Sequence, residues 1–159
     1  MTALAMMQAI ATVEESIELP AAVVSANGLN NFKSVKKAYI NGLDKSTNLT
    51  NLPCFINWYD AEPTQLRMGN FVEHNETIQV DFYAEDSDRG RLYAMAFYDA
   101  TVAAFINQQT SSKRFGSTVD HISIRSDSPA IATMEWNGLS YPGFRLFLDL
   151  QRFETVVPV

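Results

Sequence analysis

The sequence predicts an α+β fold, in which an antiparallel β-sheet carries two α-helices packed on one of its faces. Residues 3–18 and 87–109 have apolar side chains at helical spacing, whereas several shorter segments alternate apolar and polar residues. Helix-like and strand-like segments are grouped along the chain rather than strictly alternating, as in α+β proteins. The length of 159 residues favours a single domain, residues 1–159.

The composition excludes several classes of protein. It contains 12 Lys and Arg, 18 Asp and Glu, 1 Cys and 2 His, and its net charge is −6. One cysteine excludes a disulfide framework within the chain and a multi-cysteine zinc module. The acidic balance argues against a protein that coats nucleic acid. No apolar run approaches the roughly 18 residues of a membrane span. We expect no metal and no other cofactor.

The first predicted helix covers residues 3–18, and Pro20 follows it. Its apolar stripe consists of Met6, Ile10, Val13 and Ile17. No Lys or Arg precedes Lys33, so the positively charged region of a secretion signal is missing. We therefore expect an intracellular protein, or one that is assembled inside a cell.

Residues 26–52 are rich in Asn and Gly, which favour turns. Because long loops in small domains are usually functional or mobile, we expect an extended arm or insertion here. The segment also contains a basic patch with interleaved aromatic residues: Phe32, Lys33, Lys36, Lys37 and Tyr39. Such a patch is typical of a solvated face, of single-stranded nucleic-acid binding, or of contact with an acidic partner surface.

Two strands and the second helix are predicted next. Residues 54–59 read as an apolar strand, and residues 77–84 alternate between a buried and an outward face. The acidic residues 85–88 predict the start of the second helix, since they complement its dipole and cap its free N–H groups. This helix, which includes Phe97 and Ala100, is apolar nearly all round, so we expect the first helix or a neighbouring subunit to cover it.

The C-terminal part predicts about three strands, at residues 122–124, 131–136 and 144–151, with a turn at Asn137-Gly138. The alternation places Tyr83 and Phe147 on outward sheet faces. Because both side chains are aromatic, this placement indicates burial by another chain.

Candidate catalytic groups are few. His74 follows Glu73, and a carboxylate beside an imidazole can act as a general-base pair. Because adjacent residues on a strand point to opposite faces, we instead expect a solvated loop histidine. The acidic run 85–88 suggests a cation site, but its spacing differs from that of a calcium loop. Cys54 reads as a buried structural thiol.

The layout of the chain resembles the tail terminator (tail completion) proteins of long-tailed bacteriophages, together with related neck and minor tail proteins. The resemblance covers most of the chain outside residues 26–52. It rests on the order and size of the elements and on the segments 52–58, 83–86, 91–99, 135–143 and 144–150.

The resemblance implies a structural virion protein of the tail or neck, assembled in the host cytoplasm, and no enzyme. The family forms a ring, usually a hexamer, which caps the tail tube, stops its polymerisation and joins it to the head connector. Expected partners are other copies of the chain, the tail tube protein, a connector or neck protein and the sheath. DNA would only pass through the lumen, where acidic residues would repel it; no membrane contact is implied.

A heterologous ring contact joins two different patches. As subunit or partner interface residues we predict Phe32, Lys33, Lys36, Lys37, Tyr39, Tyr83, Phe97, Ala100 and Phe147. Two alternatives remain open at this point. One is a small ligand-binding or regulatory α+β module. The other is a small enzyme that uses Glu73 and His74, or the acidic run 85–88.

Overall fold

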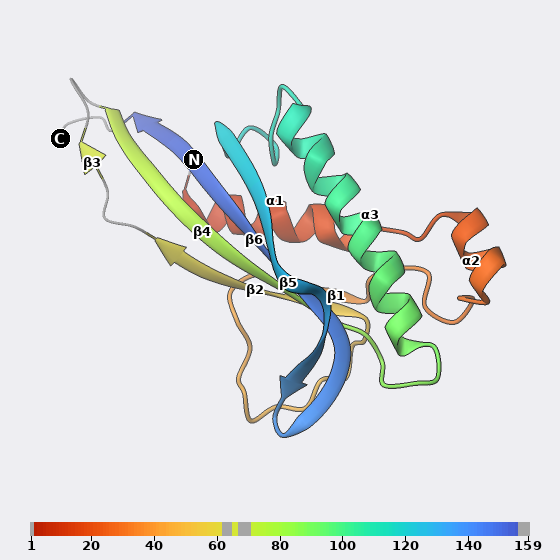
Figure 1. The fold of residues 1–159 in the computed structure, drawn as a ribbon. Helices are drawn as coiled ribbons and strands as arrows, with labels where there is room; N and C mark the ends of the chain where they lie inside the picture. The colour runs from red at the N-terminus through yellow and green to blue at the C-terminus, as the bar shows by residue number, and fades with distance from the viewer. Residues whose placement is uncertain (1, 62–64, 67–70, 156–159) are drawn as a thin grey trace.

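The computed structural model describes residues 2–61, 65–66 and 71–155, and this part of the chain has an α+β fold (Figure 1). Three helices and a single sheet of six strands are found among these residues, which confirms the predicted fold class. In chain order, the elements are α1 (Ala3–Glu15), α2 (Ala21–Asn27), β1 (Lys37–Tyr39), β2 (Cys54–Ala61), β3 (Gln65–Leu66), β4 (Phe71–Tyr83), α3 (Gly90–Thr110), β5 (His121–Trp136) and β6 (Leu139–Thr155).

The sheet is mixed, whereas the sequence predicts a purely antiparallel one. Its strand order is β1-β2-β4-β6-β5, and the short β3 pairs with β4. All pairs of neighbouring strands are antiparallel except β1 and β2, which are parallel. The parallel pairing of β1 and β2 is possible because residues 40–53 form a long connection that returns the chain from the end of β1 to the start of β2.

The last two strands form one long hairpin. Asn137 and Gly138 have φ angles of 49° and 75°, as the two central residues of a type I′ turn require, so the predicted turn is confirmed. The sequence predicts two short strands before this turn. The structure instead has the continuous β5, with a shift of register between Ser126 and Ile131, because a β-bulge interrupts the pairing without ending the strand.

The main core lies between the sheet and the helices α1 and α3. Helix α1 contacts β1 and β2, whereas α3 contacts β5 and β6. Both helices supply side chains to one apolar cluster. At its centre, the ring of Phe82 lies 4.8 Å from that of Phe144 and 5.0 Å from that of Phe97. The prediction of two helices on one face is therefore confirmed.

A second, smaller core lies on the opposite face, under residues 41–53. Its buried members are Leu49, Cys54, Ile56, Tyr83, Met134, Trp136 and Tyr141. The indole N–H of Trp136 donates to the carbonyl of Thr47 at 2.7 Å, which fastens the loop to the β5–β6 hairpin. Cys54 is 1% exposed, and burial raises the pKa of its thiol to about 12, so it is the buried structural thiol that the sequence predicts.

The structure does not confirm an extended arm at residues 26–52. This segment contains the end of α2, β1 and their connections, and it buries Leu29, Ala38 and Leu49 in the two cores. The short helix α2 is not among the elements predicted from the sequence. Its signals are nevertheless ordinary ones: Pro20 stands immediately before it and Gly28, with φ of 66°, ends it.

The start of α3 also differs from the prediction. The helix begins at Gly90 rather than at residue 87, and its N-cap, Arg89, makes no side-chain capping bond. The acidic residues 85–88 therefore precede the helix and do not cap it. A Cβ on Gly90 would lie 2.5 Å from the carbonyl oxygen of Glu85, so the preceding turn packs directly on the first residue of the helix.

Candidate functional site

The nine predicted interface residues do not form one surface. Five lie between α2 and the end of β1, and the others lie on β4, α3 and β6. Phe97 is fully buried in the main core, and Ala100, on the same helix, is partly buried against it. These two side chains build the fold itself.

Tyr83 is covered by its own chain. It is 2% exposed, and its ring packs edge-on against Trp136 at 5.9 Å and Tyr141 at 6.0 Å. The expectation that another chain must cover Tyr83 is therefore wrong. Sequence alternation assigns the correct face, but it does not show that a loop distant in sequence folds over that face.

Phe147 lies beneath a charged side chain. It is half-buried, and the guanidinium of Arg125 lies 4.4 Å from its ring centroid. Arg125 also donates to Asp149 at 2.7 Å. Partial burial favours the protonated form of Asp149, but hydrogen bonds from Arg125 and Thr77 outweigh it and lower the pKa of Asp149. Phe147 is thus covered by Arg125, which belongs to an exposed ion pair with Asp149.

The basic patch remains at the surface beside β1. Lys33, Lys36 and Lys37 are exposed, and the ammonium of Lys37 lies 5.9 Å from the ring centroid of Tyr39. Phe32 turns away from them and packs edge-on against Tyr93 of α3, at 5.4 Å. The lysines are therefore accessible, whereas the aromatic side chains on either side of them, Phe32 and Tyr39, pack against the two cores.

The outer stripe of α3 is a surface that the nine residues do not include. We define it as Leu92, Met95 and Ile106, which are 40%, 49% and 46% exposed. Their spacing places them on one side of the helix, opposite the buried Phe97 and Phe105. The apolar pattern predicts cover on more than one side of this helix, and the part of the chain that the structure describes covers only one.

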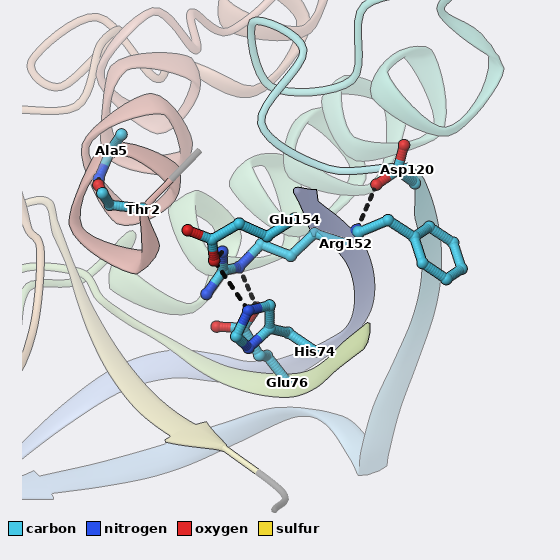
Figure 2. Close-up of polar contacts among 8 residues, drawn as sticks. Thr2, Ala5, His74, Glu76, Asp120, Arg152 and Glu154 are labelled. Atoms are coloured by element: carbon cyan, nitrogen blue, oxygen red, sulfur yellow. Dashed lines mark hydrogen bonds and ion pairs between the residues drawn. The ribbon is translucent and has the colours of Figure 1, made fainter. Parts of the chain in front are cut away.

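A charged cluster lies where the start of β4 pairs with the end of β6 (Figure 2). We call His74, Glu76, Arg152 and Glu154 the distal cluster. Arg152 pairs with Glu76, and both side chains are at most 6% exposed. His74 Nε2 lies 2.9 Å from Glu154 Oε2, and the guanidinium of Arg152 lies 3.4 Å from the same oxygen. The hydrogen bond with His74 is the main reason why the pKa of Glu154 is lowered.

His74 lies on β4 and is half-buried, so it is not the solvated loop histidine that the sequence predicts. Adjacent strand residues point to opposite faces, so Glu73 contacts Gln151 on one face while His74 contacts Glu154 on the other. Near the distal cluster, burial and the carboxylate of Glu76 raise the pKa of Tyr59 to about 12. The cluster therefore contains a histidine–carboxylate pair beside a phenol that keeps its proton.

A further titratable group is fully enclosed between α1 and the sheet. Glu14 is 0% exposed, and its Oε1 accepts a hydrogen bond from the amide of Asn57. Burial, aided by the nearby Glu15, raises its pKa from 4.5 to about 8. Its second oxygen has no hydrogen-bond partner. We therefore expect the attachment of α1 to depend on pH.

An aromatic hollow of about 360 Å³ lies on the face opposite the helices. Its lining residues are Lys45, Trp58, Gln79, Asp81, Tyr83, Glu135, Trp136, Asn137 and Arg145. Under the hollow, Arg145 Nε donates to Asp81 at 2.7 Å, and the indole of Trp58 donates to the same carboxylate at 3.2 Å. The sequence does not point to this site, because its residues come from a loop, a turn and four strands. The available signal is that both tryptophans of the chain occur in predicted strands.

The remaining candidates carry less chemistry. Asp86 and Asp88 lie with Arg91 around a shallow surface hollow near the β5–β6 hairpin. Among residues 2–61, 65–66 and 71–155, no group of three His, Cys, Asp or Glu side chains is placed to hold a metal ion. Within the same ranges, no helix has the length and hydropathy to cross a membrane. No protein-family model matches the chain, and no curated protein is significantly similar to it in sequence.

Proposed function

We propose that this chain is a structural protein of the bacteriophage tail, a tail terminator that forms a ring on the end of the tail tube. The ring stops polymerisation of the tube and joins it to the head connector. The fold is consistent with this role, because an α+β protein of this layout is what the resemblance implies. Its work is assembly, and it requires no reaction.

The outer stripe of α3 is the observation that carries the proposal. Large apolar side chains that lie together on a surface mark contacts with other proteins, whereas isolated ones are ordinary. Leu92 and Met95 lie one turn apart on the exposed side of α3, and Ile106 lies about three turns further along that side, beyond the exposed Asp99, while the other side of the helix is packed. Such a stripe is suited to burial against a neighbouring subunit.

A ring also requires a second patch that differs from the first, because its contacts are heterologous. Exposed apolar side chains on other elements supply candidates: Leu4, Ile40, Leu139 and Phe153. Leu139 is 52% exposed and directly follows the turn of the β5–β6 hairpin. A contact between the stripe of one subunit and this hairpin of the next would repeat around a closed ring.

The net charge of −6 suits a ring through which DNA passes. DNA carries one negative charge for roughly each 1.7 Å of its axis, so an acidic lumen would repel it and prevent adhesion. Reversal of several lumen-facing acidic residues to Lys should then slow DNA ejection. Unchanged ejection would contradict this part of the proposal.

The central experiment compares oligomeric state with and without tail tubes. We expect rings in negative-stain images and a matching mass by light scattering, either in solution or on tube ends. The double variant Leu92→Glu/Met95→Glu should abolish them, whereas Asn107→Glu, on an exposed position of the same helix, should not. A wild-type protein that stays monomeric and leaves tube length unrestricted would refute the proposal.

A further inference from the structure

Three asparagines of the chain are followed directly by glycine, at positions 27, 41 and 137. An asparagine before a glycine is prone to spontaneous loss of its side-chain amide, because glycine has no Cβ to obstruct attack by its backbone nitrogen. All three asparagine side chains are exposed. Exposure alone therefore does not distinguish the three sites, and the surroundings of each glycine nitrogen decide which one reacts.

In two of the three pairs, the glycine nitrogen is already engaged in a hydrogen bond. The N–H of Gly28 donates to the carbonyl of Val24 at the end of α2, and the N–H of Gly42 donates to the carbonyl of Asn57 at 2.6 Å. Gly42 is also crowded, because a Cβ there would lie 2.7 Å from the ring of Trp58. Attack by either nitrogen first requires its hydrogen bond to break.

The third pair is open. Asn137 and Gly138 are the two central residues of the turn between β5 and β6. Within residues 2–61, 65–66 and 71–155, the N–H of Gly138 has no backbone acceptor. A Cβ on Gly138 would meet no atom within 4 Å, its chain neighbours aside. The nitrogen is therefore unobstructed, and there is room for the ring that forms when it attacks the side chain of Asn137.

The amide of Asn137 fastens residues 41–53 to the β5–β6 hairpin. Its Nδ2 donates to Asn48 Oδ1 at 2.7 Å and to the carbonyl of Ser46 at 3.4 Å. A carboxylate in its place would set a negative oxygen opposite these two acceptors, so repulsion would replace both hydrogen bonds. The indole of Trp136, which donates to the carbonyl of Thr47, would still hold the loop.

We propose that Asn137 is a site of spontaneous deamidation, and that the reaction loosens residues 41–53 from the β5–β6 hairpin. The backbone nitrogen of Gly138 forms a bond to Cγ of Asn137, while the bond from Cγ to Nδ2 breaks. Nδ2 leaves as ammonia and takes the proton of the attacking nitrogen. Water then opens the succinimide ring at one of its two carbonyls and gives aspartate or isoaspartate. The product carries one more negative charge at neutral pH.

The single cysteine of the chain reports on the loosened loop. Cys54 is 1% exposed and packs in the smaller core together with Leu49, which belongs to residues 41–53. We expect a thiol reagent to reach Cys54 when this loop opens. The rate of labelling then measures how firmly the loop is held.

The first test compares the three asparagines within one sample. The whole protein is aged at neutral pH, and deamidation at each site is followed by proteolysis and mass spectrometry. We expect Asn137 to react about five- to tenfold faster than Asn27 and Asn41, because only these two have a glycine nitrogen that must first lose a hydrogen bond. Faster reaction at Asn27 or Asn41 would overturn the assignment. The reaction takes place within one chain, so this inference does not rest on the function proposed above.

The second test places the product in the protein directly, as Asn137→Asp. Asp-Gly also suits a type I′ turn, so the hairpin and the circular dichroism should be retained. Asn27→Asp is the matched control, since it makes the same change of charge at an exposed position at the end of α2. We expect labelling of Cys54 to be about five- to tenfold faster in Asn137→Asp than in the wild type, and unchanged in Asn27→Asp.

A third variant approaches the same contact from the loop. Asn48→Ala removes the acceptor of the 2.7 Å hydrogen bond without adding a charge, so labelling of Cys54 should also become faster, but by less than in Asn137→Asp. Equal labelling rates in Asn137→Asp and Asn27→Asp would show that the amide of Asn137 does not hold the loop. That result would overturn the structural consequence, whatever the rate of deamidation.

Discussion

The helix-side face of β4 and β6 has two regions that are chemically opposite. Toward the end of β4, alternate positions carry apolar side chains such as Val80 and Phe82, which are 0% exposed. Toward its start, the same alternation places His74 and Glu76 on this face, where they pair with residues of β6. The side chains on this face of β4 therefore change from charged to apolar along one continuous strand.

The difference shows that the two regions respond differently to change. In the apolar region, each side chain contributes to the free energy of unfolding in proportion to the apolar area that it buries and the volume that it fills. In the distal cluster the charges are costly to bury, and their mutual pairing only offsets that cost. We therefore expect the loss of stability on mutation in the core to increase with the size of the side chain removed. In the distal cluster, we expect it to depend on whether the mutation leaves a charge without its partner.

The largest effect is expected in the apolar region. Phe82→Ala removes a ring that contacts Phe97 and Phe144, so the free energy of unfolding should fall by about 3–5 kcal/mol. Chemical denaturation monitored by circular dichroism would measure it. Phe153→Ala, at a position that is 43% exposed, is the control and should cost far less. Similar losses for both would contradict the assignment of the core.

In the distal cluster, the loss of one partner should cost more than the loss of both. Arg152→Met leaves the carboxylate of Glu76 buried without its cation, so we expect a loss of about 3 kcal/mol. Glu76→Leu added to this variant should restore most of the stability. A double-mutant cycle by urea denaturation tests this. Additive losses would show that the pair is not coupled.

Glu14 should make stability depend on pH. Its pKa is raised to about 8 in the folded chain, against an ordinary value of 4.5. Between these two pH values the folded chain holds a proton that the unfolded chain releases, so stability should fall as the pH rises, and should level off above pH 8.

Glu14→Gln keeps an acceptor for Asn57 but cannot ionise. We expect this variant to lose the slope and to exceed the wild type by about 1–3 kcal/mol at pH 8. Thermal unfolding at pH 5, 6, 7 and 8 provides the measurement. Parallel curves for the two proteins would show that another group causes the pH dependence.

The smallest effect is expected at the rim of the distal cluster. Glu154 is 35% exposed, so its pairing with His74 is screened by water. His74→Ala should therefore cost at most about 1 kcal/mol, and high salt should reduce the difference further. The pKa of Glu154 should also rise toward its ordinary value, which a carbon-detected NMR titration would show. A loss as large as that of Arg152→Met would contradict this ranking.

Local patterns account for the parts of the fold that were predicted correctly. The alternation of Phe144, Leu146 and Leu148 identifies the buried face of β6, and Asn137-Gly138 identifies its turn. Each of these signals needs only a few neighbouring residues. The parallel pairing of β1 with β2 has no such signal, because it depends on how the connection between the strands folds.

The sites were harder to predict for the same reason. Arg152 and Glu76 are 76 positions apart, and the atoms that surround Tyr83 come from three separate segments. The sequence assigns His74 to a solvated loop, whereas the pairing of β4 with β6 brings it beside Glu154. The exposed side of α3 was indicated by composition, whereas the aromatic hollow required the register of the strands.

The register of β4 with β6 has a consequence for folding kinetics. Phe71 pairs with Thr155 and Tyr83 with Gly143, so the central contact of the sheet joins residues far apart in the chain. The β5–β6 hairpin, in contrast, closes across two residues. Hairpin formation before docking of β4 is therefore the expected order, since loop closure is costly until many contacts form at once. We expect folding to take milliseconds to seconds and β4 to join the sheet late. This long central strand would then be the last part of the sheet to be protected from solvent.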